Sequence, residues 1–171
     1  MRYRRSYVPG GVYFFTVNLR DRRSTLLVDK IDDLRASVRW VRNQYPFDIH
    51  AWVVLPDHLH AVWSLPDGDA DYSSRWREIK KRFVKSLSGR PVGSPSPWQN
   101  RFWEHSIRDE LDYQRHVDYV HWNPMKHKLV SRVVDWPYSS FHRAVAQGIY
   151  PEDWCGDIES DDGRFLHQYD I

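Results

Sequence analysis

Residues 47–65, FDIHAWVVLPDHLHAVWSL, contain two apolar runs that are separated by Pro56-Asp57. Each run is rich in aromatic and β-branched residues, which favour strands, and a Pro-Asp pair favours a turn. The segment therefore predicts a tight β-hairpin, with one strand over 47–55 and the next over 58–65. On this hairpin His58 and His60 lie two residues apart within an otherwise apolar strand.

The segments on either side of this hairpin extend it to an α+β domain. The pattern predicts strands at 11–19 and 101–108 and helices at 30–44, 72–87 and 109–122. The last helix is expected to stop at Asn123-Pro124, because proline disfavours the helical conformation of the residue before it. The order β-α-β-β-α-β plus a helix is that of a ferredoxin-like split βαβ fold, an antiparallel sheet with helices on one face. We expect one domain over 1–155 and a polar, acidic tail over 156–171 that is a candidate for disorder.

The two histidines are expected to project from the same face of the sheet. Side chains at i and i+2 of a strand share a face, so Leu59, Ala61 and Trp63 point the other way, into the helix-covered core. Two neutral imidazoles side by side suit a divalent metal ion. A histidine pair with this spacing also occurs often without a metal, so the interpretation depends on which other groups reach that face.

The helix predicted over 109–122 supplies further polar groups. His116, Tyr119 and Asn123 follow one stripe of this helix, and Tyr113, Val117 and Val120 follow a neighbouring apolar stripe. We expect the apolar stripe to pack on the sheet and the polar stripe to lie at the edge of that contact. The carboxamide oxygen of Asn123 is a candidate third ligand for Mg²⁺ or Mn²⁺, and Tyr119 is equally consistent with an ordinary aromatic residue at the core margin.

Charge is unevenly distributed, although the chain has a formal net charge of only +2. Residues 1–23 hold six arginines and one aspartate, and 73–90 hold seven cations and one glutamate, whereas 152–171 hold seven acids and one arginine. Two basic blocks favour a surface that faces a polyanion. The single cysteine excludes an internal disulfide, and no apolar run is long enough for a membrane span. The N-terminal segment lacks the apolar stretch of a secretory signal, so we expect a cytoplasmic protein.

Five collinear segments resemble a known family. They are YRRSYVPGGVYFFTVNL, AWVVLPDHLHAVWSLP, SSRWREIKKRF, RFWEHSIRDELDYQRHVDYVHWNPMKH and DWPYSSFHR, which together cover most of residues 3–155. A His-hydrophobic-His pair on a strand, with a tyrosine on a later helix, resembles the single-tyrosine HUH endonucleases. The wider pattern is similar to the REP-associated tyrosine transposases (RAYT).

The resemblance implies a site and a reaction. His58 and His60 would bind the metal, and Tyr119 would be the nucleophile. Asn123 stands where the superfamily commonly has glutamine, so the third ligand departs from the pattern, and His105 and His116 are substitutes. The implied activity is a metal-dependent single-stranded DNA endonuclease and strand transferase that forms a 5′-phosphotyrosine. The implied partner is a hairpin of the REP or BIME type.

Several alternatives stay open. The chain would also fit a DNA-hairpin-binding protein that does not cleave, or a hydrolase in which Glu104 or Glu78 activates water. Related transposases are often dimers, and we expect a monomer here. Unpaired bases would stack on Tyr3, Tyr7, Trp76 or Trp98. Phosphates would be bound by basic residues of the N-terminus, the helix at 72–87 and the turn after Asn123, namely Arg2, Arg4, Arg5, Arg75, Arg77, Lys80, Lys81, Lys85 and Lys126.

Overall fold

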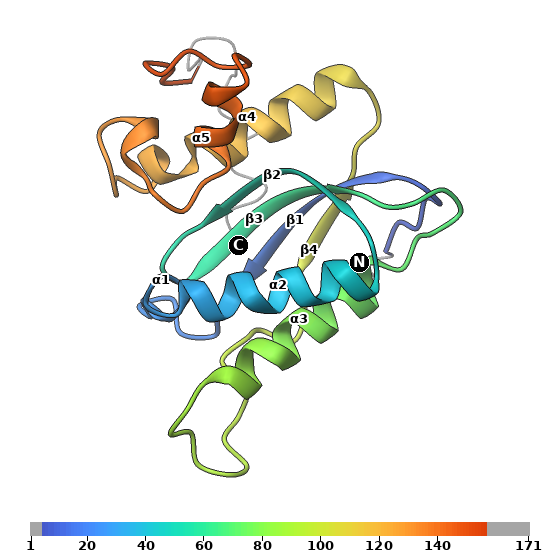
Figure 1. Ribbon diagram of the computed structural model, residues 1–171, viewed down its shortest axis with the longest axis vertical. Helices are drawn as coiled ribbons and strands as arrows, with labels where there is room; N and C mark the ends of the chain where they lie inside the picture. Colours follow the sequence, from blue (N-terminus) through green and yellow to red (C-terminus); the bar gives the residue numbers. More distant parts are fainter. Residues whose placement is uncertain (1–4, 157–171) are drawn as a thin grey trace, which may run out of the picture.

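The computed structural model describes residues 5–156 of the chain (Figure 1). Within this range no helix is long and apolar enough to cross a membrane. The elements in chain order are β1 (Val12–Asn18), α1 (Leu26–Asp29), α2 (Ile31–Gln44), β2 (Asp48–Val54), β3 (His58–Ser64), α3 (Tyr72–Ser86), β4 (Trp103–Ser106), α4 (Glu110–Lys126), the 3₁₀ helix η1 (Val133–Asp135) and α5 (Phe141–Ala146).

The four strands form one antiparallel sheet in the order β2-β3-β1-β4. β2 and β3 are the predicted hairpin, joined by three residues around Pro56-Asp57. The central strand β3 pairs with β2 on one side and with β1 on the other, so both of its edges are hydrogen-bonded. With α2 and α3 inserted between the strands, the predicted ferredoxin-like topology is confirmed.

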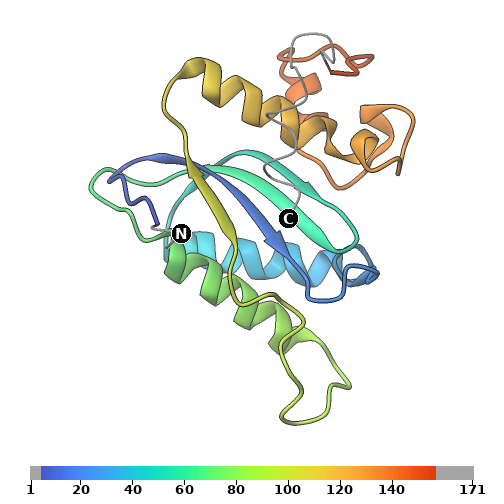
Figure 2. The same ribbon diagram turned by 180° about the vertical axis from the view of Figure 1, so that it is seen from behind.

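One face of the sheet, here called the α3 face, is covered by α2 and α3 (Figures 1 and 2). Leu59, Ala61 and Trp63 point into this face, as the alternation along the strand predicts. The rings of Trp63 and Trp76 stack with centroids 4.3 Å apart and an angle of 14° between their planes. Burying such large side chains contributes most of the free energy that stabilises a domain.

The opposite face, here called the α4 face, is not left open, because α4 packs across it. Phe14, Val62, Val117 and Val120 form a second buried cluster there. The expectation of helices on one face therefore describes only α2 and α3. The composition of β3 explains why a helix also covers the second face. Six of its seven residues are buried, as expected for a strand that is covered on both sides.

The helix α4 runs through Asn123-Pro124 and ends at Lys126, so the predicted stop at this dipeptide is wrong. The side chain of Asp109 caps its first turn by accepting a hydrogen bond from the backbone N–H of Asp112, at 2.8 Å. Pro124 removes one helix hydrogen bond only, and it does so in the last turn. Both Asn123 and Pro124 are buried, so packing of this turn outweighs the local preference.

Candidate catalytic site

His58 and His60 lie side by side on the α4 face, at the end of the sheet where β1 ends and β3 begins. In the register of the sheet His58 pairs with Asn18, and His60 pairs with Thr16. The two imidazole centroids are 5.1 Å apart, with the rings nearly perpendicular at 83°. Both side chains are almost fully buried. The predicted pair is therefore present on one face.

Each imidazole is held by a hydrogen bond through its Nδ1 atom. Nδ1 of His60 is 2.9 Å from the hydroxyl of Thr16, and Nδ1 of His58 is 2.8 Å from a carboxylate oxygen of Asp57. Asp57 in turn binds Arg22 at 2.7 Å. Nε2 of His60 is buried without a hydrogen-bond partner among the described residues. Such bonds to Nδ1 fix the ring and leave Nε2 as the atom that can bind a metal.

The electrostatic environment keeps His60 neutral. Burial lowers the pKa of His60 well below its ordinary value, and interactions with His58 and His127 lower it further. Burial raises the pKa of Asp57, but its interactions with His58 and Arg22 outweigh this and lower it below the ordinary value. Metal binding requires a neutral imidazole, as for His60, and an ionised carboxylate beside the other imidazole, as for Asp57 beside His58.

Helix α4 places Tyr119 against this pair. The rings of Tyr119 and His60 are 5.2 Å apart, and Tyr119 is only 2 % exposed. The ammonium group of Lys126 donates a hydrogen bond to the Tyr119 hydroxyl at 3.2 Å. An ammonium group at this distance stabilises the phenolate, which is the nucleophilic form. The imidazole of His127 lies 4.9 Å from that of His58.

The polar stripe of α4 is buried, not placed at the edge as expected. His116 and Asn123 are fully buried, and Val117 and Val120 pack beside them. The two stripes are only about 100° apart around the helix, so one broad contact covers both.

Asn123 has an unusual environment. Neither its Oδ1 nor its Nδ2 has a hydrogen-bond partner among the described residues, although the side chain is fully buried. A buried amide without partners costs free energy, so native proteins rarely keep one unless it serves another purpose. Two imidazole nitrogens and a carboxamide oxygen form a donor set that fits Mn²⁺ or Mg²⁺.

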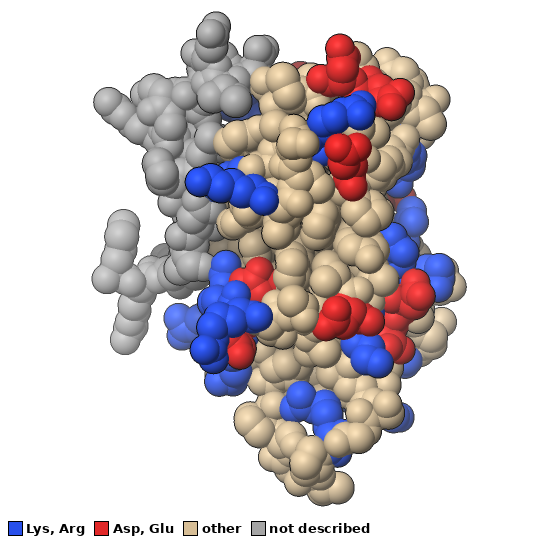
Figure 3. Space-filling model, turned by 90° about the vertical axis from the view of Figure 1, so that its left-hand side faces the viewer, with Lys and Arg blue, Asp and Glu red and all other residues tan. Residues whose placement is uncertain are grey.

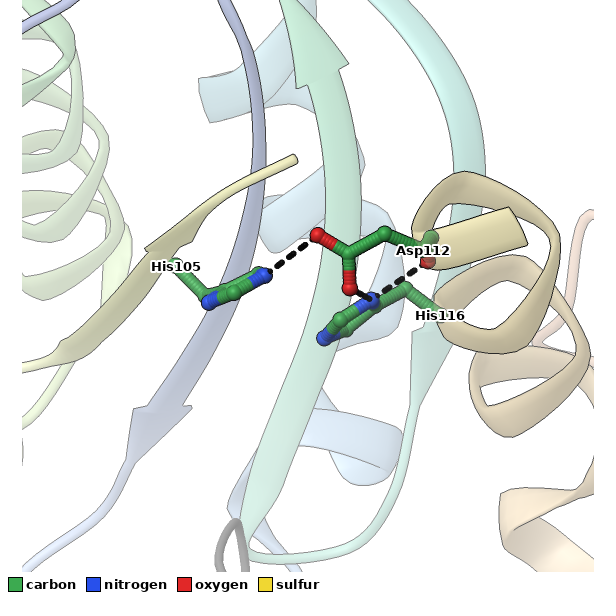
Figure 4. Close-up of side chains that lie close together, drawn as sticks. All are labelled: His105, Asp112 and His116. Carbon is green, nitrogen blue, oxygen red and sulfur yellow. Dashed lines mark hydrogen bonds and ion pairs between the residues drawn. The ribbon is translucent and has the colours of Figure 1, made fainter. Parts of the chain in front are cut away.

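His105 and His116, the substitute ligands, form a separate cluster around Asp112 (Figure 4). Nε2 of His105 lies 2.8 Å from the Asp112 carboxylate, and Nδ1 of His116 donates to the Asp112 backbone oxygen at 2.7 Å. The two rings stack at 4.6 Å with 18° between their planes. Their ligand atoms are close enough for a metal ion, but nearly parallel rings do not point toward one centre. The cluster ties the first turns of α4 to β4 and thereby supports the position of Tyr119.

The expected phosphate-binding residues differ in their exposure. Arg2 and Arg4 lie outside the described residues. Arg77, Lys81 and Lys85 are exposed on α3, whereas Arg5 and Lys80 are partly buried. Arg75 is buried and donates to Asp69 at 2.7 Å and to the backbone oxygens of Pro46 and Tyr45. Arg75 is therefore a structural residue, because its guanidinium group is already used within the fold.

The aromatic residues expected to stack on bases are mostly unavailable. Trp76 is fully buried in the α3 face, and Trp98 is 1 % exposed. Tyr7 is exposed, with its ring stacked on that of Tyr72 at 5.3 Å. Tyr3 lies outside the described residues.

Sequence reasoning missed several groups near the histidine pair. Arg20, Arg22 and Arg23 follow β1 and are exposed, and Arg22 binds Asp57, the residue before His58. Figure 3 shows the side of the molecule that contains this end of β1, with a dense cluster of basic side chains. The excess of arginine in residues 1–23 was a signal for such a surface, but the charge count did not show that it borders the histidines.

This geometry, a histidine pair on a central strand beside a helix-borne tyrosine, defines the class of tyrosine transposases. No protein-family model matches the chain. A REP-associated tyrosine transposase from Escherichia coli is 55 % identical over 156 residues, which cover 91 % of this chain and 92 % of that protein. A relative from Haemophilus influenzae is 43 % identical over 163 residues, which cover 90 % of this chain and 93 % of its own length. The chain belongs to the REP-associated tyrosine transposases.

A solved structure gives the same result for the fold. It is described as a REP-associated tyrosine transposase bound to a REP hairpin, and it is 53 % identical to this chain. The match covers 95 % of both chains with a TM-score of 0.86. The α+β fold and the resemblance to this family are thus confirmed.

Proposed function

We propose that this protein is a metal-dependent endonuclease and strand transferase for single-stranded DNA hairpins of the REP type. The observation that carries the proposal is the contact of His60 with His58 and with Tyr119 on the α4 face, with Asn123 one turn further along α4. Two of these groups, Nε2 of His60 and the amide of Asn123, are buried without protein partners among the described residues. Mg²⁺ or Mn²⁺ held there would stabilise negative charge on the scissile phosphate.

The protein side chains perform the remaining steps. Lys126 favours the phenolate of Tyr119, whose oxygen attacks the phosphorus atom. The bond from phosphorus to the 3′ oxygen breaks, and the 3′ oxygen takes up the proton that the phenol lost. The products are a free 3′-hydroxyl and a 5′-phosphotyrosine. Because the phosphodiester energy is retained, another 3′-hydroxyl can reverse the reaction, which gives strand transfer.

Hydrolysis by activated water is disfavoured by the position of its candidate bases. Glu104 pairs with Phe15 and points into the α3 face, where it accepts a hydrogen bond from Tyr72 at 3.2 Å. Glu78 lies on α3, on the same side of the sheet. Both carboxylates are thus separated by the sheet from His58 and His60, so neither is positioned to deprotonate a water molecule there.

The proposed partner follows from the relative that binds a REP hairpin and from the basic surfaces of this chain. Arg22 lies next to the histidine pair through Asp57. The remaining proposed phosphate contacts are Arg5, Arg77, Lys80, Lys81, Lys85 and Lys126. We propose a monomer that acts in the cytoplasm, in which Tyr119 contacts His60 of the same chain. We propose residues 1–155 as the active unit; residues 157–171 of the predicted tail lie outside the described residues.

The test is a denaturing gel of the purified protein with an end-labelled single-stranded REP hairpin, with Mn²⁺ or Mg²⁺ or with EDTA. A metal-dependent protein–DNA adduct is expected for the natural protein, and none for Tyr119→Phe. Tyr138→Phe is the matched control, because Tyr138 packs against the α3 face of the sheet, opposite the histidines. Cleavage that survives in Tyr119→Phe would show that water is the nucleophile. Tight binding without cleavage would favour the alternative of a protein that only binds hairpins.

A further inference from the structure

A pocket of about 230 Å³ lies at the outer edge of the sheet, between α2, the edge strand β2 and the start of α5. The β2 residues that line it, Ile49, Trp52 and Val54, pack against the cluster of the α3 face. His58 and His60 lie on the α4 face, so this pocket is separate from the candidate catalytic site.

Three arginines line this pocket, and none of the described residues that line it is acidic. Arg35 and Arg42 lie seven residues apart on α2, which places them on one side of that helix. Arg143 comes from α5, a distant part of the chain. The fold thus gathers positive charge from two helices at one pocket, which favours an anionic ligand.

Backbone oxygens hold two of these side chains in place. Nη2 of Arg143 donates to the backbone oxygens of Ile49 and His50, at 3.0 and 3.3 Å. Nε of Arg42 donates to the backbone oxygen of Phe47 at 2.8 Å. These contacts orient the guanidinium groups without neutralising their charge, and each group has further N–H donors. Such planar groups suit a phosphate, because they can donate two parallel hydrogen bonds to its oxygens.

Acidic side chains lie beside the pocket but do not line it. Asp32 is 3.7 Å from Arg35, and Asp48 is 3.4 Å from Arg42. The two carboxylate side chains are 95 % and 81 % exposed, so these ion pairs are weak. Their charge would repel a long polyanion such as DNA, whereas one small phosphate group reaches the arginines with less repulsion.

Several backbone groups along the outer edge of β2 are already hydrogen-bonded. The N–H of Trp52 donates to the hydroxyl of Ser140, and its oxygen accepts from the N–H of Ser140, each at 2.8 Å. An added strand of a partner protein would need these groups, so the pocket does not suit strand addition. Its volume is below the range of about 300–1,000 Å³ that is usual for drug-sized ligands, which favours a small molecule.

Trp52 supplies an aromatic wall of the pocket. Its ring is nearly parallel to that of Trp76, with centroids 6.2 Å apart and 14° between the planes. Trp76 is fully buried, whereas Trp52 is only partly buried and lines the pocket. A planar base can therefore lie against Trp52, and the hydroxyl group of Ser139 beside it can donate a hydrogen bond.

We propose that this pocket binds a free mononucleotide, with its phosphate group at the three arginines and its base against Trp52. The inference does not rest on the proposed function, because the pocket and the histidine pair lie on opposite faces of the sheet. The nucleotide would link α2, β2 and α5, and its binding would stabilise the folded protein.

Isothermal titration calorimetry tests the proposal, with adenosine 5′-monophosphate (AMP), adenosine and inorganic phosphate as separate probes. EDTA is present throughout, because a metal ion at the histidine pair could itself bind phosphate. AMP is expected to bind more tightly than adenosine or inorganic phosphate. Arg35→Ala should weaken AMP binding about tenfold, as for one lost charge-assisted contact. Arg39→Ala is the control, because Arg39 is an exposed arginine on α2 that does not line the pocket.

A second readout locates the bound nucleotide. The natural protein is irradiated with 8-azidoadenosine 5′-monophosphate, and the labelled peptide is identified by mass spectrometry. Label on β2 or on residues 139–143 that excess AMP prevents supports the proposal, and label elsewhere overturns it.

Three results of the titrations would also overturn the proposal. They are the absence of AMP binding, equal affinity for adenosine or inorganic phosphate, and unchanged AMP binding by Arg35→Ala. A last comparison uses a single-stranded oligonucleotide that cannot form a hairpin. If it displaces AMP at equal nucleotide concentration, the pocket is part of a DNA-binding surface and the assignment to a free nucleotide is wrong.

Discussion

The two faces of the sheet differ in what they bury. The α3 face buries Trp63, Trp76, Phe15 and Tyr72 in contact with one another, and such side chains stabilise the fold. The α4 face buries polar groups among its apolar ones, including His60 and Asn123 with atoms that lack protein partners among the described residues. Burial without such partners costs free energy. One face thus supplies stability, and the other uses part of it to hold reactive groups in fixed positions.

The largest effect expected on the α4 face is that of His60→Ala on cleavage. Cleavage of the hairpin should fall by about 10³-fold or more, since a bound metal contributes several kcal/mol of charge stabilisation. The folded state should remain, because only one of the two ring nitrogens of His60 has a protein partner among the described residues. Single-turnover cleavage and urea unfolding measure the two quantities, with the exposed His142→Ala as the control. A variant that unfolds would show that His60 is chiefly structural.

On the α3 face Trp76→Ala should have the opposite effect, which is a loss of stability with cleavage per folded molecule retained. Trp76 is fully buried, so its removal is expected to lower the free energy of unfolding by about 3–5 kcal/mol. Trp40→Ala is the control, because Trp40 is 39 % exposed and should lose much less. A variant that keeps its stability but loses cleavage per folded molecule would contradict the assignment of stability to the α3 face.

A pH effect on stability should come from His116 on the α4 face. Burial lowers the pKa of His116 to about 4, although its bond to the Asp112 backbone and the Asp112 charge oppose the shift; His105 and Arg108 add to it. Between about pH 6.5 and 4 the unfolded state binds a proton that the folded state does not. Stability should therefore fall on acidification by up to about 1.4 kcal/mol per pH unit. Urea unfolding of His116→Phe should show a correspondingly smaller slope, and an unchanged slope would assign the effect to other groups.

The smallest expected effect is a gain in stability. Asn123→Leu removes an unpaired buried amide without a large change in volume, so the metal-free protein should become more stable by about 1 kcal/mol. Added Mn²⁺ should no longer stabilise the variant, in contrast to the natural protein. Asn43→Leu, at an exposed position of α2, is the control. Lower stability in EDTA would indicate that the amide has a structural role.

Local sequence patterns predicted much of this structure. The spacing of His58 and His60 determined that they share a face, and the apolar spacing along α4 placed Val117 and Val120 against the sheet. Helix boundaries were predicted less accurately. The helix α4 continues through Pro124, because packing of the last turn offset the lost hydrogen bond.

Charge counts could not separate neighbours with different environments. Arg75 and Arg77 lie two residues apart on α3, yet only Arg75 reaches Asp69 and the backbone of Tyr45. Likewise, the sequence did not show that Lys126 donates to the hydroxyl of Tyr119. Both contacts depend on which face of a helix meets another part of the chain.

The sequence by itself determined the order of the elements, the shared face of the histidine pair and the family resemblance, because these follow from short-range periodicity and from motifs. Only the tertiary structure decided that α4 covers the histidines, that Glu104 faces away from them and that Asn123 is buried without partners. The reason is physical. Orientation and burial of a side chain depend on the packing of elements far apart along the chain, whose free energy exceeds the local preferences that a sequence pattern records.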